Sequence, residues 1–271
     1  MGDVTGEAPL SFGMRPLWLL VLGSCLVHSL AAQADYRNLD DGRPVASEDA
    51  WPIEHRGLEL LAPIGVSRQG GVTSTLVTPE LGWGVWRNAM IGIKLPLLLE
   101  SEGGFAGTRA YAFYNFNAES PALPGFALRA DMSLPGGAVA GEQVTVALKA
   151  IATRSWGKLR THLNVLHGFG SGTALPSAEA APHWGASLAG DLVSLRHSTL
   201  FLLEIRTAQA TADDDFEWTA AAGVRTQVTP TLVLDAGMAT SIGVAEGNAL
   251  SFTLGLSHAF GWRALWPRSI R

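Results

Sequence analysis

The sequence predicts an all-β protein, a transmembrane antiparallel up-and-down β-barrel of about 12 strands. Three observations predict this fold. The 271 residues are 47% hydrophobic and only 16% charged, whereas an ordinary soluble domain is about 25% charged. Outside the N-terminal region, no stretch approaches the roughly 18 consecutive apolar residues of a membrane helix. Apolar residues instead recur at every second position over long segments, which is typical of strands with one apolar and one polar face.

The composition also excludes several classes of protein. The formal net charge is −5 at pH 7, so there is no basic surface of the kind that binds nucleic acid. The high apolar content excludes a disordered chain. The shortage of long apolar runs excludes a polytopic helical membrane protein.

Residues 1–34 are expected to direct export and then to be removed. Arg15 supplies a basic start, an apolar run follows it, and Ala32-Gln33-Ala34 forms a small-x-small cleavage site. A conventional signal begins at Met14, so residues 1–13 are interpreted as lying upstream of the true start.

Cys25 is the only cysteine of the chain. Cleavage after Ala34 would leave a mature protein with no thiol, and therefore with no disulfide and no cysteine metal site. The absence of thiols suits a chain that crosses an oxidising periplasm unfolded. A competing interpretation makes Cys25 the lipidated residue of a lipoprotein, but the apolar run continues past it toward the Ala-x-Ala site.

Residues 35–55 are polar and do not alternate, and they contain Pro44 and Pro52. We expect a periplasmic segment or a plug in the mouth of the barrel, preceding the barrel proper at 56–260. Its charged residues are the candidates for pairing with charges in the lumen and for gating: Asp40, Asp41, Arg43, Glu48 and Asp49.

The mature chain divides into long alternating segments. Between 126 and 134, for example, Phe126, Leu128 and Ala130 share one face, and Arg129 and Asp131 share the other. Such segments are longer than the 5–6 residues of an average soluble strand, as tilted membrane strands must be. The predicted strands are 56–66, 73–85, 88–98, 105–116, 124–134, 142–154, 157–168, 182–193, 198–208, 215–227, 230–240 and 248–260.

The connections between these strands sort by length. An even number of strands puts both ends of the chain on the periplasmic side. The short turns at 86–88, 154–156 and 228–230 then fall on that side, and the longer loops at 168–182 and 207–215 fall on the outer side, with 117–123 as a long exception. Aromatic residues near both sets of strand ends predict two interfacial girdles: Trp83, Trp86, Trp156 and Phe260 on the periplasmic side, and Phe105, Phe169, Trp184, Phe216 and Trp218 on the outer side.

The last predicted strand resembles the C-terminal assembly signal of outer-membrane proteins, which ends in Phe after alternating apolar residues. Phe252, Leu254, Leu256 and Phe260 fit that pattern, whereas His258 stands where an aromatic residue is usual. The chain also continues past Phe260 through a tail, 261–271, that is expected to fold back at the periplasmic mouth or to be disordered.

Alternate positions of the predicted strands share one face, and the face that carries the charged and polar residues is assigned to the interior of the barrel. The reason is that a charge facing lipid costs about 2–4 kcal/mol at the midplane. The charges on this face are of both signs. Two interpretations stay open: these residues pair across strands and stiffen the barrel, or a subset lines a path for a solute. The predicted lumen residues are Glu59, Glu80, Lys94, Arg109, Arg129, Asp131, Lys149, Arg160, His162, Asn164, Asp191, Glu204, Arg206, Glu217, Arg225 and Asp235.

The sequence does not favour an enzyme. His162 and Asn164 share a face and Ser187 lies on the next predicted strand, but they face the lumen, whereas a lipid-cleaving site should face the bilayer. No metal-ligand spacing or phosphate-binding loop is present, so no catalytic residue, cofactor or metal is expected. The acidic run 213–215 is interpreted as a solvated loop tip rather than a calcium site.

The region before the first strand carries a family resemblance. Asp40-Asp41-Gly42-Arg43-Pro44-Val45 followed by Glu48-Asp49-Ala50, with Tyr114-Asn115-Phe116 and Leu148-Lys149-Ala150 further on, resembles the outer-membrane transporters of the phenol-degradation meta-pathway family. The resemblance extends over about residues 35–260. It implies a β-barrel that passes small, often aromatic or apolar, compounds, and it carries no binding residues over to this chain.

We therefore expect a channel or transporter in the outer membrane of a Gram-negative bacterium, for passive uptake of small solutes that include aromatic or apolar compounds. Solutes would diffuse through a lumen gated by residues 35–54 and the 168–182 loop. The expected partners are outer-membrane lipid, lipopolysaccharide, the barrel-assembly machinery and a small-molecule solute, with no nucleic acid. One alternative is a plugged structural or surface-binding barrel. Side chains fill the interior of a barrel of about eight strands, whereas a barrel of sixteen strands leaves a channel, and twelve lies between. A second alternative is an outer-membrane hydrolase.

Overall fold

The computed structural model describes residues 34–100, 103–169, 182–195, 197–242 and 249–261. All regular structure in this part of the chain is β-structure. The strand segments are β1 (Gly57–Leu61), β2 (Ile64–Gln69), β3 (Val72–Val77), β4 (Glu80–Trp86), β5 (Ala89–Lys94), β6 (Leu97–Leu98), β7 (Gly104–Phe105), β8 (Thr108–Asn115), β9 (Gly125–Leu134), β10 (Thr145–Trp156), β11 (Leu159–Phe169), β12 (Trp184–Val193), β13 (Thr199–Gln209), β14 (Glu217–Thr229), β15 (Leu232–Ile242) and β16 (Leu250–Gly261).

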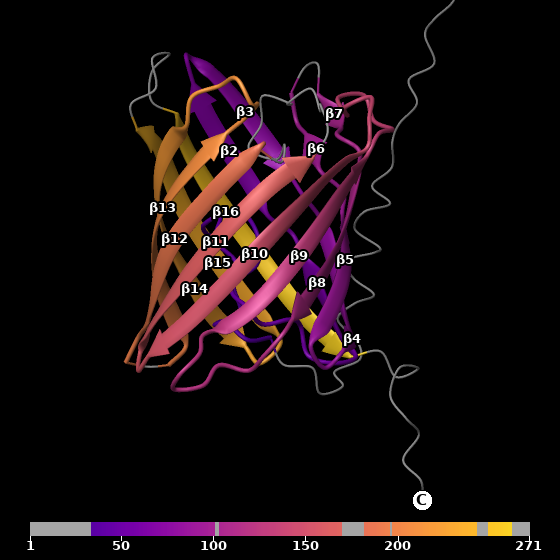
Figure 1. The fold of residues 1–271 in the computed structure, drawn as a ribbon. Helices are drawn as coiled ribbons and strands as arrows, with labels where there is room; N and C mark the ends of the chain where they lie inside the picture. Colours follow the sequence, from indigo (N-terminus) through magenta and orange to yellow (C-terminus); the bar gives the residue numbers. More distant parts are fainter. Residues whose placement is uncertain (1–33, 101–102, 170–181, 196, 243–248, 262–271) are drawn as a thin grey trace, which may run out of the picture.

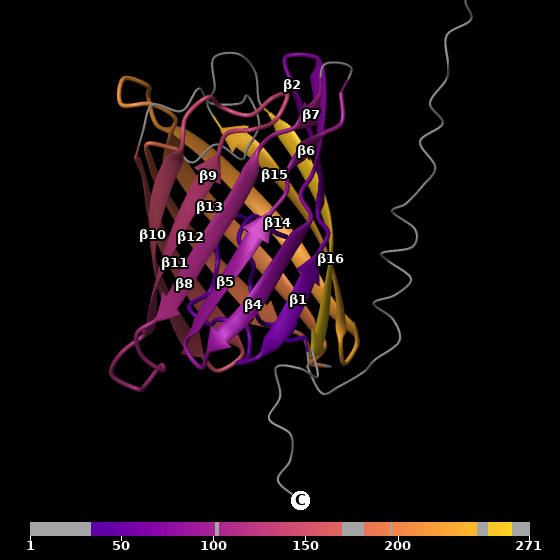
Figure 2. The ribbon, with the colours of Figure 1, turned by 90° about the vertical axis from the view of Figure 1, so that its right-hand side faces the viewer.

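These segments form one closed antiparallel barrel of 12 strands, and the predicted fold class is confirmed. The first eight segments make four barrel strands that are each interrupted once: β1 with β2, β3 with β4, β5 with β6, and β7 with β8. β9 to β16 are the other eight, each paired with its neighbours in chain order. β16 pairs with both β1 and β2, which closes the barrel without a free edge (Figures 1 and 2).

The interruptions correct the expectation that 56–66, 73–85, 88–98 and 105–116 are continuous strands. Three of them fall at Pro63, Pro79 and Pro96, and proline has no N–H to give to a strand ladder. The proline carbonyls still accept hydrogen bonds from the next strand, for example from Leu95 N to Pro79 O at 2.9 Å. The regular strand ladder is therefore interrupted at a similar height in four neighbouring barrel strands, and hydrogen bonds between the strands continue at that height.

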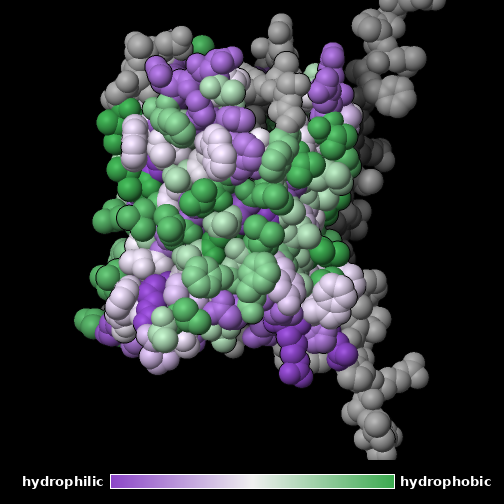
Figure 3. Space-filling model, in the orientation of Figure 1, coloured by the Kyte–Doolittle hydropathy of each residue, from purple (hydrophilic) through white to green (hydrophobic). Residues whose placement is uncertain are grey.

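The outer surface is apolar and the lumen is polar. Side chains such as Leu203, which is 70% exposed, and Leu254, 63% exposed, project outward from the wall. Figure 3 shows apolar side chains gathered around the middle of the barrel, with polar side chains toward both ends. This is the distribution that a bilayer-embedded barrel requires. No helix in the described residues is long and apolar enough to cross a membrane.

Both ends of the barrel wall, Gly57 and Gly261, pair with each other at one end of the barrel, which we call the periplasmic end. Most connections at that end are short, as in the two-residue turns after β4, β10 and β14. The exception expected at 117–123 is a loop between β8 and β9, ordered by Asn117, whose Oδ1 accepts from Phe126 N and whose Nδ2 donates to Pro124 O. At the outer end the connections are longer, apart from a tight turn between β2 and β3.

Several sequence predictions fall outside the described residues. They are the signal over 1–33, most of the 168–182 loop and the tail over 262–271.

Candidate functional site

Residues 35–54, which we call the plug, lie inside the barrel. The segment enters at the periplasmic end, where Ala34 N donates to Pro230 O at 2.9 Å, and returns there, where Arg56 N donates to Gly84 O at 2.6 Å. Between these points it contacts lumen side chains from β5 to β16. The segment therefore occupies the periplasmic half of the lumen (Figures 1 and 2).

Two apolar clusters attach the plug to the wall. Tyr36, Leu39 and Val45 pack with Leu200 and Leu202 of β13, and all five are buried. A second cluster joins the C-terminal part of the plug to the neighbouring wall through Ala50, Trp51, Ile53, Met90, Tyr111, Phe113, Ala127 and Ile151. Burying such side chains contributes about 1.5–3 kcal/mol each. The plug and the inner face of the wall therefore share a hydrophobic core that stabilises the docked position of the plug.

The tip of the plug carries the first group of ion pairs. Glu48 accepts from Arg129 Nη1 at 2.8 Å and lies 3.3 Å from Lys149 Nζ. Asp41 pairs with Lys149 and, at 3.0 Å, with Lys94 Nζ. Arg129 is 1% exposed, so the pairs with Glu48 form in a desolvated site. Its guanidinium also stacks over the ring of Tyr111, 3.9 Å from the centroid.

A second group lies at the first bend of the plug. Asp40 accepts from Arg225 Nη1 at 2.7 Å and from Arg43 Nη2 at 2.9 Å. Arg43 Nη1 in turn donates to Asp235 at 2.9 Å. Each of these four side chains comes from a position predicted from the sequence, and together they form an alternating array of two acids and two bases.

A third group surrounds Asp49. Its carboxylate accepts from Arg160 Nη1 at 3.3 Å, and Arg160 also pairs with Asp191 at 2.7 Å. His162 Nε2 lies within hydrogen-bond distance of Asp191 Oδ2, at 2.8 Å, and His162 Nδ1 lies 3.0 Å from Thr153 Oγ1. A buried chain of hydrogen bonds thus runs from the plug into β11 and β12.

Side chains of the wall also hold the backbone of the plug. Asn164 accepts from Glu48 N and donates to Glu48 O, both at 2.9 Å. Glu204 accepts from Ala46 N at 3.2 Å and from Ser47 N at 2.5 Å. Side chains of the wall therefore provide the backbone partners that a neighbouring strand would otherwise give.

Two glycines make room for the plug at Pro44. Gly223 of β14 and Gly237 of β15 lie opposite each other in register, and a Cβ atom at either position would overlap Pro44. At Gly237 the overlap is with the backbone carbonyl, which cannot rotate away. Thr253 Oγ1 donates to that same carbonyl at 3.3 Å. Pro44 thus sits where the wall has no side chains.

The environment of the plug shifts the pKa of its carboxyl groups in opposite directions. Burial raises the pKa of Asp49 to about 7, against the smaller opposing effects of Arg160 and two backbone N–H donors. Burial also acts on Asp41, but Lys149, Lys94 and Arg129 outweigh it and hold the pKa of Asp41 well below its ordinary value. Neighbouring acids of one segment therefore respond to different ranges of pH.

The 16 predicted lumen residues have differing environments in the structure. The structure buries twelve: Glu59, Glu80, Lys94, Arg129, Lys149, Arg160, His162, Asn164, Asp191, Glu204, Arg225 and Asp235. Asp131, Arg109 and Arg206 are half-buried, and Glu217 is exposed. Whether they line a path for a solute stays a prediction.

Sequence reasoning missed several residues that hold the plug. Tyr111, Thr153 and Ser257 are uncharged and were not selected, although each lies on a predicted inward face. Gly223 and Gly237 were missed as well. Glycine at an inward position of a long strand is the signal that could have indicated a close approach of another backbone.

The structure does not assemble a catalytic set from His162, Asn164 and Ser187. His162 is bound to Thr153 and Asp191, Asn164 is bound to Glu48, and the Ser187 hydroxyl hydrogen bonds with that of Ser47 at 2.7 Å. No group of three or more His, Cys, Asp or Glu side chains in the described ranges is placed to hold a metal ion.

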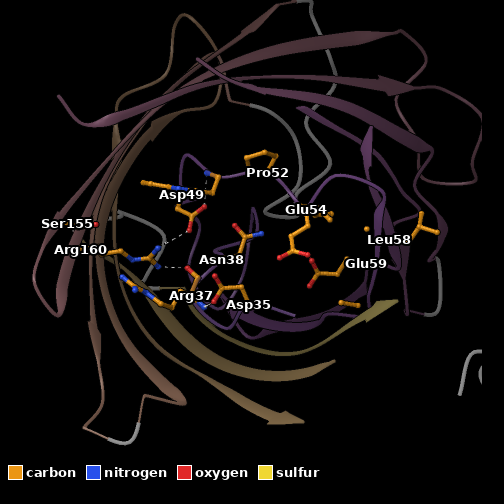
Figure 4. A pocket seen from close by; sticks show the side chains of 14 residues that line it. Asp35, Arg37, Asn38, Asp49, Pro52, Glu54, Leu58, Glu59, Ser155 and Arg160 are labelled. Atoms are coloured by element: carbon orange, nitrogen blue, oxygen red, sulfur yellow. Dashed lines mark hydrogen bonds and ion pairs between the residues drawn. The ribbon is translucent and has the colours of Figure 1, made fainter. Parts of the chain in front are cut away.

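A cavity of about 400 Å³ remains between the plug and the wall at the periplasmic end (Figure 4). Its polar lining comes from Asp35, Arg37 and Glu54 of the plug and from Glu59 and Arg160 of the wall.

No protein-family model matches the chain, and no curated protein matches it. Solved structures do match. The COG4313 outer membrane channel from Pseudomonas putida F1 aligns with a TM-score of 0.59 at 14% identity, covering 82% of this chain and 100% of that one. The KdgM porin gives 0.52 at 12% identity, covering 74% and 99%. The NanC porin gives 0.54 at 6% identity, covering 73% and 98%.

These similarities show the fold. The chain has the porin-like barrel fold of outer-membrane channels. These three proteins are described as channels or porins.

Proposed function

We propose that this protein is an outer-membrane channel through which small solutes diffuse passively, with the plug as its gate. The observation that carries the proposal is a separate segment of the chain that fills the periplasmic half of the lumen and is held there by non-covalent contacts. Its acids Asp40, Asp41, Glu48 and Asp49 each pair with a basic side chain within the barrel. If the plug leaves the lumen, water or a charged solute can take the place of its carboxylates beside the basic side chains of the wall.

The proposed path follows the predicted lumen residues. From the outer end a solute would meet Arg109, Arg206 and Glu217, which are not fully buried. It would then meet the ion pairs at the tip of the plug, where Arg129 and Lys149 lie. Because the acids and bases there are balanced, we expect little selectivity for charge once the plug has moved.

The proposed substrates are small solutes, aromatic or apolar compounds among them. The support is the resemblance to the phenol-degradation meta-pathway family in the segment Asp40-Asp41-Gly42-Arg43-Pro44-Val45, together with the fold shared with solved channels. We further propose export by the 1–34 signal, assembly by the barrel-assembly machinery, and contact with lipopolysaccharide at the outer girdle.

A second candidate function is a permanently plugged barrel that serves a structural or surface-binding role. The filled periplasmic half of the lumen favours it, because Arg43 and Glu48 are each only 2% exposed. This candidate predicts that no solute crosses the barrel under any condition in which it stays folded.

Uptake into liposomes distinguishes the two. The refolded full chain would be compared with its Arg129→Ala/Arg160→Ala variant, using benzoate and a sugar of similar size. Faster uptake of benzoate, with the preference lost in the variant, supports a selective channel. No uptake of either solute by folded, inserted protein would sink the channel proposal and leave the plugged barrel.

A further inference from the structure

Arg206 of the barrel wall differs from the arginines that hold the plug. Arg129 pairs with Glu48 at 2.8 Å, and Arg225 pairs with Asp40 at 2.7 Å. Arg206 is half-buried, and no carboxylate in the described part of the chain lies within ion-pair distance of it. Because a guanidinium keeps its charge at any physiological pH, Arg206 remains a cation without a counter-ion from the described wall or plug.

Arg206 lies on β13 directly above the plug. Alternation along the strand places it on the same face as Leu202 and Glu204. Leu202 packs in the apolar cluster of the plug, and Glu204 accepts from the backbone N–H groups of Ala46 and Ser47. Arg206 is the next residue on that face toward the outer end, about 7 Å further along the strand. It therefore borders the lumen at the level where the plug ends.

Two hydroxyl side chains flank Arg206. The register pairs Arg206 with Ser187 of β12 and with Thr219 of β14, and residues opposite each other in this way have Cβ atoms about 4.5–5.5 Å apart. The hydroxyls of Ser187 and Ser47 share one hydrogen bond of 2.7 Å, so one of the two O–H groups is free to donate elsewhere. The Thr219 hydroxyl makes no hydrogen bond with the described residues. This row of three side chains therefore offers a guanidinium between two hydroxyl donors.

The neighbouring acids do not occupy the guanidinium of Arg206. The Glu204 carboxylate is directed to the plug, where it accepts from Ser47 N at 2.5 Å. Glu217 lies diagonally across β13 and β14, is exposed, and forms no ion pair among the described residues. Neither acid makes the paired N–H···O contacts that a guanidinium and a carboxylate form. The donor groups of Arg206 are therefore open to an anion from outside the chain.

The next level toward the outer end is apolar. Leu166, Gly185 and Ala208 stand in register across β11, β12 and β13, on the face that carries Ser187 and Arg206. Glycine has no side chain and alanine has only a methyl group, so two of these three positions project little into the lumen. An apolar body attached to an anionic group at Arg206 would lie against this level of the wall.

We infer that this row is a binding site for small organic carboxylates, with Arg206 as the residue that holds the anionic group. Two guanidinium N–H groups would donate to the two carboxylate oxygens, and the Thr219 hydroxyl would donate to one of them. The apolar body would lie against Leu166, Gly185 and Ala208. The inference rests on the proposed function in one respect: the site would be the last that a solute occupies before the plug moves.

Fluorine NMR titration of the detergent-solubilised full chain tests this inference. The probes are the anionic para-fluorobenzoate, the neutral para-fluorobenzyl alcohol and the cationic para-fluorobenzylamine. We expect para-fluorobenzoate to bind most tightly, and Arg206→Gln to weaken it by about tenfold, which corresponds to loss of one charge-assisted hydrogen bond. Arg206→Lys keeps the charge without the planar fork, so its affinity should lie between the two. Arg68→Gln is the matched control, because it removes the same charge from an exposed position on β2 and should leave the affinity unchanged.

Three results would overturn the inference: para-fluorobenzyl alcohol binding as tightly as para-fluorobenzoate, unchanged affinity in Arg206→Gln, or an equal loss in Arg68→Gln. Arg206 has no ion-pair partner in the described structure, so replacing it leaves no buried carboxylate unpaired and the variant should fold. The titration needs no transport. Carboxylate binding without liposome uptake would therefore contradict the proposed channel alone, and uptake without carboxylate binding would contradict this site alone.

Discussion

The two halves of the lumen differ in what fills them. The periplasmic half contains the plug, and several charged wall residues there have a partner on it, as Arg129 has in Glu48 and Arg225 has in Asp40. Toward the outer end, inward positions carry the small side chains Thr219 and Ser241 together with the long side chains Arg109, Arg206 and Glu217. The same barrel wall thus encloses a half that is packed by the plug and a half that is lined by its own inward side chains.

This difference indicates where the resistance to a solute lies. At the outer end the width of the lumen is set by the number of strands and by the inward side chains, whereas in the periplasmic half the docked plug closes it. We therefore expect changes at the plug to have large effects on uptake and equivalent changes at the outer end to have small ones.

The largest effect is expected from removing charge on the plug. Asp40→Asn/Glu48→Gln leaves Arg225 and Arg129 short of partners, and breaking a buried pair costs about 3–5 kcal/mol. The docking equilibrium of the plug should shift by roughly 100-fold or more, and single-channel conductance should rise. Asp213→Asn/Asp215→Asn, which makes the same charge change in an outer loop, is the control. Equal conductance in both variants would contradict the prediction.

A smaller effect is expected from steric displacement without any change of charge. Gly237→Ala places a Cβ against the Pro44 carbonyl, and overpacking of this kind costs about 1–3 kcal/mol. Gly65→Ala is a matched lumen-facing change in the outer half, where the nearest atom lies at 4.0 Å. Liposome uptake should increase for Gly237→Ala only. An increase for Gly65→Ala would show that the outer half also limits flow.

The docking of the plug should also depend on pH. Burial raises the pKa of Asp49 to about 7 in the docked plug from an ordinary 3.8, so the docked state binds an additional proton between these values. Docking is then favoured at low pH and loses this contribution as the pH rises toward 7. Conductance should increase from pH 5 to pH 8, and Asp49→Asn should flatten the profile. A decrease over that range would contradict the assignment.

The smallest effect is expected at the outer mouth. Glu217 is exposed and takes part in no ion pair among the described residues, so Glu217→Gln should change neither conductance nor the melting temperature of the barrel. Screening by solvent limits what such a charge contributes. A large change in conductance would contradict this prediction and would show that the outer end of the lumen determines selectivity.

The wall could be predicted from the sequence because its signal is local. A strand alternates with a period of two, so Arg129 and Asp131 could be assigned to the interior from their spacing to Leu128 and Ala130 alone. The interruptions at Pro63, Pro79 and Pro96 were missed, although proline inside a strand is itself a warning. The alternation of apolar and polar residues on both sides of each proline nevertheless favours one continuous strand.

For the plug, the sequence indicates only a polar, charged segment that does not alternate, and not the contacts that the segment makes. Asp40 and Glu48 were expected to meet lumen charges, but which charge each meets depends on contacts between residues far apart in sequence. Asp40 and Arg225, for example, are 185 positions apart. The roles of the neutral partners Thr153 and Ser257 likewise follow from the path of the backbone, which the local pattern does not encode.

The central claim is that the plug must move before a solute can pass. Ser47 and Ser187 hydroxyls lie 2.7 Å apart, so Ser47→Cys/Ser187→Cys in a Cys25→Ser background should form a disulfide that ties the plug to β12. Liposome uptake of benzoate should be blocked in the oxidised protein and restored by a reductant, with Ser187→Cys alone unaffected. Equal uptake by the oxidised and reduced double variant would contradict the claim.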